Sequence, residues 1–293
     1  MPMSGNNYTV SQAVSQSLAT LQQAGVSSSV FEIKLLISHI LHCEPKDIAM
    51  HHSLDETQVE LLQQMIKLRL QHCPADKIIG EKGFYKYDFA VNENVLSPRA
   101  DTEILVEKAL ENILPTHPAK ILEFGTGSGC IILSLLAERP LATGWAIDIS
   151  EDALAVADIN AEKLAITPQR LTLTKASWFD GNITKLFEDI MPFDIIVSNP
   201  PYIPTAQIAE LDDEVKLFDP HIALDGGKDG LKDYNRILEL SSLLLSPKGT
   251  VLLEAGDKAQ LEAIAKMAVA HRFNTYDIVK DLCGSERCII LKK

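Results

Sequence analysis

Hydrophobic positions in the first 75 residues recur at the spacing of amphipathic helices. Polar positions fill the opposite faces, and Gly25, Pro45 and Ser53 fall in the intervening loops. Asp55 and the two residues after it form a plausible cap region before the last stripe. This pattern predicts a small helical bundle. The three stripes are Val14, Leu18 and Leu21; Ile33, Leu36, Ile37, Ile40 and Leu41; and Val59, Leu62, Met65, Ile66 and Leu70.

The pattern changes at Ile78, where the chain reads IIGEKGFYKYDFAV. Aromatic residues cluster between turn residues there, which predicts a β-hairpin joining two domains. We therefore expect a helical domain over residues 1–77, a hairpin linker over 78–97 and a catalytic domain over 98–293.

After Pro98, apolar runs with strand character alternate with helical segments. Five strands are expected at 120–124, 143–148, 171–175, 194–198 and 250–254, and helices at 132–138, 151–165 and 231–245. Two last apolar runs, RFNTYDIVK and RCIILKK, predict an antiparallel pair at one edge. The alternation predicts an α/β fold with a seven-stranded, mainly parallel, Rossmann-like sheet covered by helices on both faces.

Composition narrows the class of protein. Hydrophobic residues make up 46% and charged residues 23% of 293 residues, the balance of a soluble globular enzyme. No apolar stretch approaches the roughly 20 residues that span a bilayer, so no membrane association is expected. The start, MPMSGNNYTVSQ, has no secretory signal pattern and predicts only a short frayed tail.

Charge and cysteines restrict the partners. The five cysteines form no CxxC pair and no zinc-spaced cluster, which favours reduced thiols in a cytoplasmic protein without a metal. A net charge of −13 counts against direct nucleic-acid binding, because phosphate recognition needs a basic surface.

A glycine-rich loop follows the strand at 120–124. Gly125, Gly127 and Gly129 would let a ligand approach the backbone at a helix start, although the run alone could be a tight turn. Asp148 ends the next strand, where a carboxylate can accept both hydroxyls of a ribose, or cap the helix starting near Ser150. Together these residues predict an adenosine-type ligand.

The loop spacing separates two ligand classes. EFGTGSG (123–129) is not the dinucleotide pattern G-x-G-x-x-G, and it resembles the first motif of class I S-adenosylmethionine-dependent methyltransferases. Glu123 suits a cationic methionine end, whereas it would repel a pyrophosphate.

The fourth strand runs directly into Asn199-Pro200-Pro201-Tyr202. The prolines fix φ and remove two N–H donors, so this rigid loop keeps free carbonyl acceptors. The Asn199 amide oxygen and the Pro200 carbonyl can accept from a substrate –NH₂ group, and Tyr202 offers a flat face. The loop predicts a clamp for a planar amine beside a methyl donor, in which orientation supplies most of the catalysis. No general base is evident beside this loop, so none is assigned.

Motifs along nearly the whole chain identify it as similar to the release factor glutamine N5-methyltransferase family. These are EIKLLISHIL (32–41), the segment 74–107 with its R-P-x-T-E-like stretch, EFGTGSG, AIDIS, SWF (177–179), SNPPYIP, LFDPHIALDGGKDGLKDY (217–234) and CGSERCIIL. The resemblance implies a protein-(glutamine-N5) methyltransferase acting on the Gly-Gly-Gln glutamine of peptide chain release factors. The helical domain would serve substrate recognition.

The resemblance also implies roles for single residues. The donor would lie on Gly125, Thr126, Gly127, Ser128 and Gly129, with Asp148 on the ribose, Trp178 on the adenine and Asn199 nearby. The catalytic clamp on the glutamine amide would be Asn199, Pro200, Pro201 and Tyr202. Without the resemblance, an aromatic after a strand such as Trp178 is more often a core residue than a ligand contact. Ala100, Ser177, Lys77 and Phe124 depart from the family pattern, and Ser177 puts one polar contact near the adenine in question.

Three other functions use the same loop or crevice. A ribosomal protein glutamine methyltransferase shares the planar amide substrate. An N6-adenine nucleic-acid methyltransferase shares the planar amine, and the negative charge argues against it. A non-catalytic adenosine-binding or assembly factor would need the donor loop alone.

Overall fold

The computed structural model describes residues 8–281 and 283–293, so residues 1–7 of the predicted frayed tail lie outside them. The rest of that stretch is not frayed, because it forms a short strand, Tyr8–Thr9, and the start of the helix Val10–Gln23. The chain divides into two compact units. Unit 1 comprises the chain up to Gly80 together with Asp212–Phe218, and unit 2 comprises Glu81–Leu211 and Asp219–Lys293. The predicted boundaries at 77/78 and 97/98 stay predictions.

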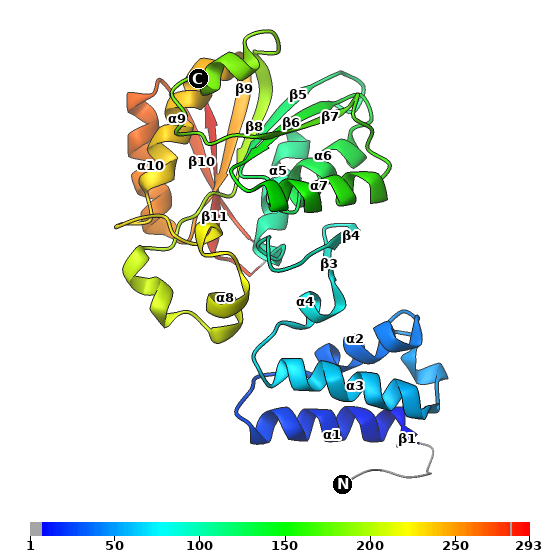
Figure 1. Cartoon of the computed structure of the whole chain (residues 1–293). Helices are drawn as coiled ribbons and strands as arrows, with labels where there is room; N and C mark the ends of the chain where they lie inside the picture. Colours follow the sequence, from blue (N-terminus) through cyan, green and yellow to red (C-terminus); the bar gives the residue numbers. More distant parts are fainter. Residues whose placement is uncertain (1–7, 282) are drawn as a thin grey trace. The chain divides into compact units, whose positions relative to one another are not determined.

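Unit 1 contains the three predicted amphipathic helices, which are confirmed (Figure 1). Asp55 is the N-cap of the third and forms a capping box with Gln58, as the cap region predicted. Short elements that the pattern did not predict complete the unit. Its helices are α1 (Val10–Gln23), α2 (Val30–Leu41), α3 (Glu56–Arg69), α4 (Ala75–Ile79) and α8 (Asp213–Phe218), and its strands are β1 (Tyr8–Thr9) and β2 (Ser53–Leu54).

A buried arginine ties α8 to this bundle. The Arg69 side chain is 1% exposed, and its Nη2 donates to Glu214 Oε1 of α8 at 2.6 Å. Its Nε lies 2.6 Å from Glu32 Oε1, an ion pair without hydrogen-bond geometry. Nη1 and Nη2 also donate to the Cys73 and Ser27 carbonyls. A guanidinium with five donors can satisfy all these acceptors at once.

Unit 2 begins with the predicted hairpin, β3 (Glu81–Phe84) paired with β4 (Tyr87–Ala90). The predicted hairpin region overlaps helix α4 at Ile78 and Ile79, so the hairpin itself starts three residues later than expected. Glu103 accepts a hydrogen bond from the Tyr85 backbone at the hairpin turn, which anchors the turn to unit 2.

The central sheet has seven strands in the order β10-β11-β9-β8-β5-β6-β7. All neighbours from β9 to β7 pair in parallel, and β11 alone pairs antiparallel with both β9 and β10. The predicted fold class is therefore confirmed. The strands are β5 (Lys120–Phe124), β6 (Thr143–Asp148), β7 (Leu171–Lys175), β8 (Phe193–Ser198), β9 (Leu245–Glu254), β10 (Thr275–Lys280) and β11 (Glu286–Lys292).

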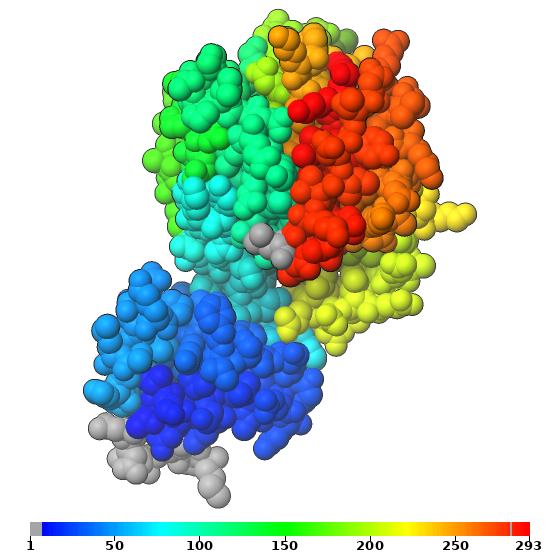
Figure 2. Space-filling view, turned by 180° about the vertical axis from the view of Figure 1, so that it is seen from behind, coloured from blue at the N-terminus to red at the C-terminus, as the bar shows by residue number. Residues whose placement is uncertain are grey.

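Helices cover both faces of the sheet (Figure 1). Alternate side chains of each strand point to opposite faces, so Ile121 packs with α5 and α6 while Leu122 packs with α9 and α10. Figure 2 shows α10 and β11 side by side along one side of unit 2. The long helices are α5 (Glu103–Glu111), α6 (Cys130–Glu138), α7 (Glu151–Lys163), α9 (Lys232–Leu244) and α10 (Lys258–Ala270).

Parallel strands bring their carboxyl ends to one edge of the sheet. β5, β6 and β8 are neighbours, so the loops after Phe124, Asp148 and Ser198 meet there. The Ser198 hydroxyl donates to the Phe124 carbonyl at 2.7 Å and fixes the two strand ends together. Within the described residues, no helix is both long and apolar enough to cross a membrane.

Candidate functional site

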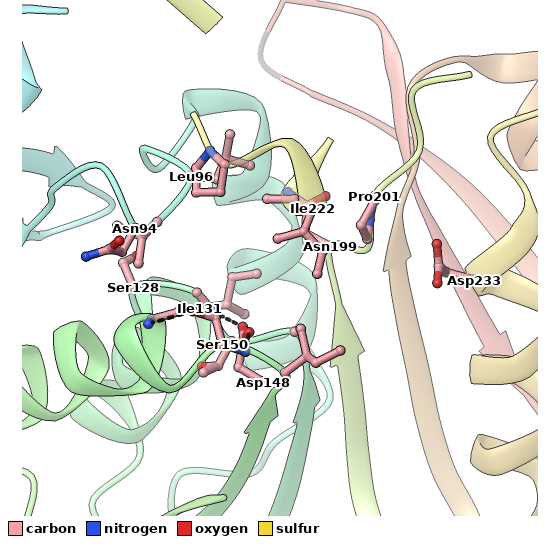
Figure 3. A pocket seen from close by; sticks show the side chains of 18 of the residues that line it. Asn94, Leu96, Ser128, Ile131, Asp148, Ser150, Asn199, Pro201, Ile222 and Asp233 are labelled. Carbon is pink, nitrogen blue, oxygen red and sulfur yellow. Dashed lines mark hydrogen bonds between the residues drawn. The ribbon is translucent and has the colours of Figure 1, made fainter. Parts of the chain in front are cut away.

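A cavity of about 220 Å³ opens at this edge of the sheet, entirely within unit 2 (Figure 3). Polar side chains from several segments of unit 2 line it, including Asp148 at the end of β6 and Asn199 after β8. The residues that line it are 94–99, 102, 125–128, 130, 131, 148–150, 153, 177–179, 199, 201, 220, 222, 223, 225, 232 and 233.

The glycine loop forms one wall together with Trp178. Gly125 has φ +73°, which favours glycine, and a Cβ there would lie 3.3 Å from the Trp178 ring, a tight contact that glycine avoids. Trp178 Nε1 donates to Asp233 Oδ1 at 2.9 Å, and Arg236 Nε donates to its carbonyl at 2.7 Å. The indole therefore has a fixed orientation at the cavity wall.

Asp148 organises both the loop and the next helix. Its Oδ2 accepts from the Gly127 N–H and its Oδ1 from the Ser150 N–H, each at 2.9 Å. Ser150 itself is the N-cap of α7, so the cap considered for Asp148 belongs to its neighbour. Burial raises the pKa of the Asp148 carboxyl group, and the backbone hydrogen bonds oppose that rise. About two of its four lone pairs remain for a ligand.

Glu123 occupies a different place from the one expected. Its side chain is fully buried and is not part of the cavity wall, so it does not face the ligand directly. Its Oε2 accepts from the Thr126 hydroxyl at 2.5 Å, which holds the glycine loop from the buried side, away from the cavity. Burial raises the pKa of Glu123 to about 8, although the Thr126 hydrogen bond lowers it. We correct its role to support of the loop.

The loop after β8 presents two of its four motif residues to the cavity. Asn199 and Pro201 lie on the wall, with Asn199 turned towards the space above Asp148 (Figure 3). Pro200 is buried, and Tyr202 is partly buried outside the described cavity wall. Burial raises the pKa of the Tyr202 phenol well above its usual range. The Tyr202 carbonyl accepts from Gln260 Nε2 at 2.8 Å, so α10 holds the end of the loop.

A second loop, residues 225–230, packs directly onto this one. Ile203 and Asp225 form a parallel bridge, and the Gly226 N–H donates to the Ile203 carbonyl at 2.9 Å. A Cβ on Gly226 would lie 2.7 Å from the Pro201 carbonyl oxygen. A Cβ on Gly230 would fall far inside van der Waals contact with the Tyr202 carbonyl oxygen. The glycines of DGGKDG therefore permit the backbone contact that shapes the loop.

The opposite wall is closed by an ion pair. Arg99 Nη2 lies 2.5 Å from Asp219 Oδ2, and the Asp219 side chain is buried. This pair joins the segment before α5 to the segment that carries Ile222, an apolar wall residue that is 56% exposed. Phe179 is also exposed on the wall, with Lys232 Nζ 5.3 Å from its ring centroid. The mouth can thus contact an apolar or cationic part of a ligand.

Several site residues were not predicted from the sequence. Asp233 orients Trp178, Gln260 holds Tyr202, and Thr102 accepts a hydrogen bond from Asn199 Nδ2 at 3.2 Å. Glu254 lies behind Asn199 at the end of β9. The same rule that selected Asp148, a polar residue at the carboxyl end of a parallel strand, would have selected Glu254.

Comparisons with known proteins agree on both parts of the chain. Residues 12–80 match the family model described as the PrmC N-terminal domain, and residues 116–286 match a methyltransferase domain model. A release factor glutamine methyltransferase from Agrobacterium fabrum is 36% identical over 295 residues, covering 99% of each chain. A bifunctional methyltransferase from Rickettsia felis is 37% identical over 97% of this chain, which spans 58% of that relative's length.

Similarity to a solved structure of low sequence identity supports the fold and nothing beyond it. A methyltransferase from Pyrococcus furiosus superposes with a TM-score of 0.50 at 21% identity, covering 78% of this chain and 96% of that one.

Proposed function

The chain belongs to the release factor glutamine methyltransferase family, and from this premise we propose its reaction. It transfers a methyl group from S-adenosylmethionine to the side-chain amide nitrogen of the glutamine in the Gly-Gly-Gln motif of peptide chain release factors. The observation that carries the proposal is the meeting of the glycine loop, Asp148 and Asn199 at one cavity. The helical unit would serve recognition of the release factor.

The residues of the cavity fit S-adenosylmethionine, which supplies a methyl group on a sulfonium. Asp148 keeps lone pairs for the two ribose hydroxyls while its backbone bonds hold it in place. The Trp178 ring, fixed by Asp233, offers a flat surface for the adenine. The loop from Gly125 to Gly129 would hold the methionine and ribose side. Ser177 lies on the wall beside Trp178, in reach of the same nucleoside.

Asn199 and its neighbours would hold the acceptor amide. The Asn199 amide oxygen would accept from the glutamine –NH₂, with Pro201 beside it on the wall. The Pro200 carbonyl as second acceptor and Tyr202 as the flat face stay predictions, because neither residue lies on the described cavity wall. The amide nitrogen bonds to the methyl carbon as the carbon–sulfur bond breaks, and the electron pair stays on sulfur as a neutral thioether. The nitrogen then loses a proton to solvent. Orientation and stabilisation of the developing positive charge carry the catalysis.

Mass spectrometry of the substrate tests this function. A bacterial release factor incubated with the protein and S-adenosylmethionine is expected to gain one methyl group on the Gly-Gly-Gln glutamine, located by peptide fragmentation. A factor with alanine in place of that glutamine is the control and should gain none. A methyl group on a ribosomal protein or a nucleic acid, with the release factor unmodified, would replace this function by one of the alternatives.

Asp148→Ala is expected to act on donor binding. The ribose hydroxyls would lose their hydrogen bonds to the charged carboxylate, which should raise the Kd for S-adenosylmethionine by about 10- to 100-fold. At saturating donor, kcat should stay within about threefold of the wild type, because Asp148 does not face the acceptor amide. Calorimetric titration of the donor measures the effect.

Asp152→Ala is the matched control, because Asp152 is an exposed carboxylate in the first turn of α7, the helix that follows Asp148. It should leave the donor Kd unchanged. An unaltered Kd in Asp148→Ala as well would restrict Asp148 to the support of the loop and of the α7 start.

A further inference from the structure

The amide group of Asn199 has a buried polar partner behind the cavity wall. Its Nδ2 donates to the Thr102 hydroxyl at 3.2 Å, and Thr102 is 2% exposed. Thr102 belongs to the 3₁₀ turn Ala100–Thr102 before α5, almost a hundred residues earlier in the chain. The contact therefore couples the loop after β8, residues 199–202, to the segment that leads into α5.

Glu254 completes this cluster from a third element. Ser198 pairs with Leu253 across β8 and β9, so the next residues, Asn199 just after β8 and Glu254 at the end of β9, lie side by side. The Glu254 side chain is 1% exposed, and its Oε2 has no hydrogen-bond partner among the residues that the structure describes. Burial raises the pKa of Glu254 to about 7, whereas hydrogen bonds with Thr102 and Asn199 lower it.

Thr102 alone does not decide which way the Asn199 amide points. A hydroxyl both donates and accepts, so it could bond either the nitrogen or the oxygen of the amide. An ionised carboxylate only accepts. With Glu254 behind it, the Thr102 hydroxyl donates to the carboxylate and accepts from Asn199 Nδ2. The amide nitrogen then faces the protein interior, and the amide oxygen faces the cavity.

We propose that Glu254 is a positioning residue that acts directly and through Thr102 to hold the Asn199 amide oxygen towards the acceptor amide. Glu254 does not line the described cavity, so its carboxylate would not touch the substrate. The inference rests on the proposed function, since it concerns how Asn199 accepts from a substrate –NH₂ group. It gives a reason for a buried acidic residue directly after the apolar run 251–253 of β9.

The direction of the pH effect follows from the chemistry of the carboxyl group. Below about pH 7 Glu254 takes a proton, becomes a donor and no longer fixes the amide. Its folded pKa lies above the ordinary 4.5, so its contribution to stability is present below pH 4.5 and is lost as the pH rises through about 7. Other ionisable groups acting on or beside it are Arg287, Asp101, Tyr202, Tyr234, Cys130 and Cys288.

Glu254→Gln and Thr102→Val test the proposal, because each keeps the shape of the side chain. Both are expected to lower kcat about 10- to 100-fold towards a release factor, since a misplaced acceptor amide loses its reactive geometry. The donor Kd should stay within about twofold. Thr102→Ser, which retains the hydroxyl, should recover most of the loss, and the double variant should lose much less than the product of the two single losses.

Ser241→Ala is the control for disturbing a buried polar group, because Ser241 is fully buried in α9 and its hydroxyl has no hydrogen-bond partner in the described part of the chain. It should leave kcat unchanged. In the wild type, kcat should decline as the pH falls through about 7, and Glu254→Gln should lack this decline. The NMR signals of the Asn199 side-chain amide, assigned by their loss in Asn199→Ala, should shift over the same pH range in the wild type only.

The outcomes separate this inference from the proposed function. If the wild type methylates a release factor but Glu254→Gln keeps its kcat and its pH profile, the positioning role is wrong and the function stands. A Thr102→Ser variant as slow as Thr102→Val would also overturn it. If the wild type modifies no release factor, the function fails first, and the pH response of the Asn199 amide signals still decides the role of Glu254.

Discussion

Alanine in place of Asn199 is expected to lower kcat by about 10²- to 10³-fold. The substitution removes the amide oxygen that would accept from the glutamine –NH₂, and one preorganised polar group in an active site is worth about this much. The donor Kd is expected to stay within about threefold, because Asp148 and Trp178 remain. Single-turnover methylation and donor titration measure the two quantities separately.

Asn235→Ala is the matched control, since Asn235 is an exposed asparagine of α9 outside the cavity wall. Asn199→Asp should be intermediate, because a carboxylate keeps acceptor oxygens but loses the Nδ2 donor to Thr102. Turnover by Asn199→Ala at the wild-type rate would show that the loop does not clamp the amide, and the proposed mechanism would have to be abandoned.

The central sheet could be predicted because its strands are short apolar runs that end in polar residues. The run at 194–198 is confirmed as Phe193–Ser198, and that at 250–254 lies within the longer strand Leu245–Glu254. Helix ends were less accurate. The helix expected at 132–138 starts at Cys130, because the glycine loop leads into it without a side-chain cap to mark the boundary.

Short elements could not be predicted, because long-range contacts determine them. Helix α8 has six residues and no buried side chain, yet it belongs to unit 1, where Glu214 meets Arg69 from 145 residues away. Helix α4 follows Pro74, and its last two residues, Ile78 and Ile79, lie in the stretch where glycines and aromatics indicated a hairpin. An isolated helix of this length is marginal in water, so packing rather than propensity forms it.

The candidate site was predictable where one strand end carries the signal, as for Asp148 and Asn199. Its supporting contacts join positions that no local pattern relates. Thr102 supports Asn199 across 97 residues, and Asp233 orients Trp178 across 55. Glu123 shows the limit of motif reasoning, because its place before the glycines was identified correctly while its side chain faces the interior.

Gly230→Ala is expected to lower kcat/KM by about 10²-fold or more and to lower the melting temperature. Gly230 has φ +72°, where a side chain costs roughly 1–2 kcal/mol. Its new Cβ would also overlap the Tyr202 carbonyl oxygen and Gln260 Nε2, the two atoms that hold the end of the catalytic loop. The backbone of the loop must move, and a shift of about 1 Å at a reactive centre costs about 10²-fold in rate.

Gly284→Ala separates the overlap from the backbone strain. Gly284 also lies in unit 2 and has φ +89°, and no atom of the residues that the structure describes lies within 4 Å of the position that a Cβ would take. It should show the loss of stability that a positive φ produces, with methylation close to the wild-type rate. Equal kinetics in the two variants would mean that the 225–230 loop does not set the position of Tyr202. A large kinetic loss in Gly230→Ala alone would establish that the 225–230 loop holds the loop after β8 in the geometry that methyl transfer needs.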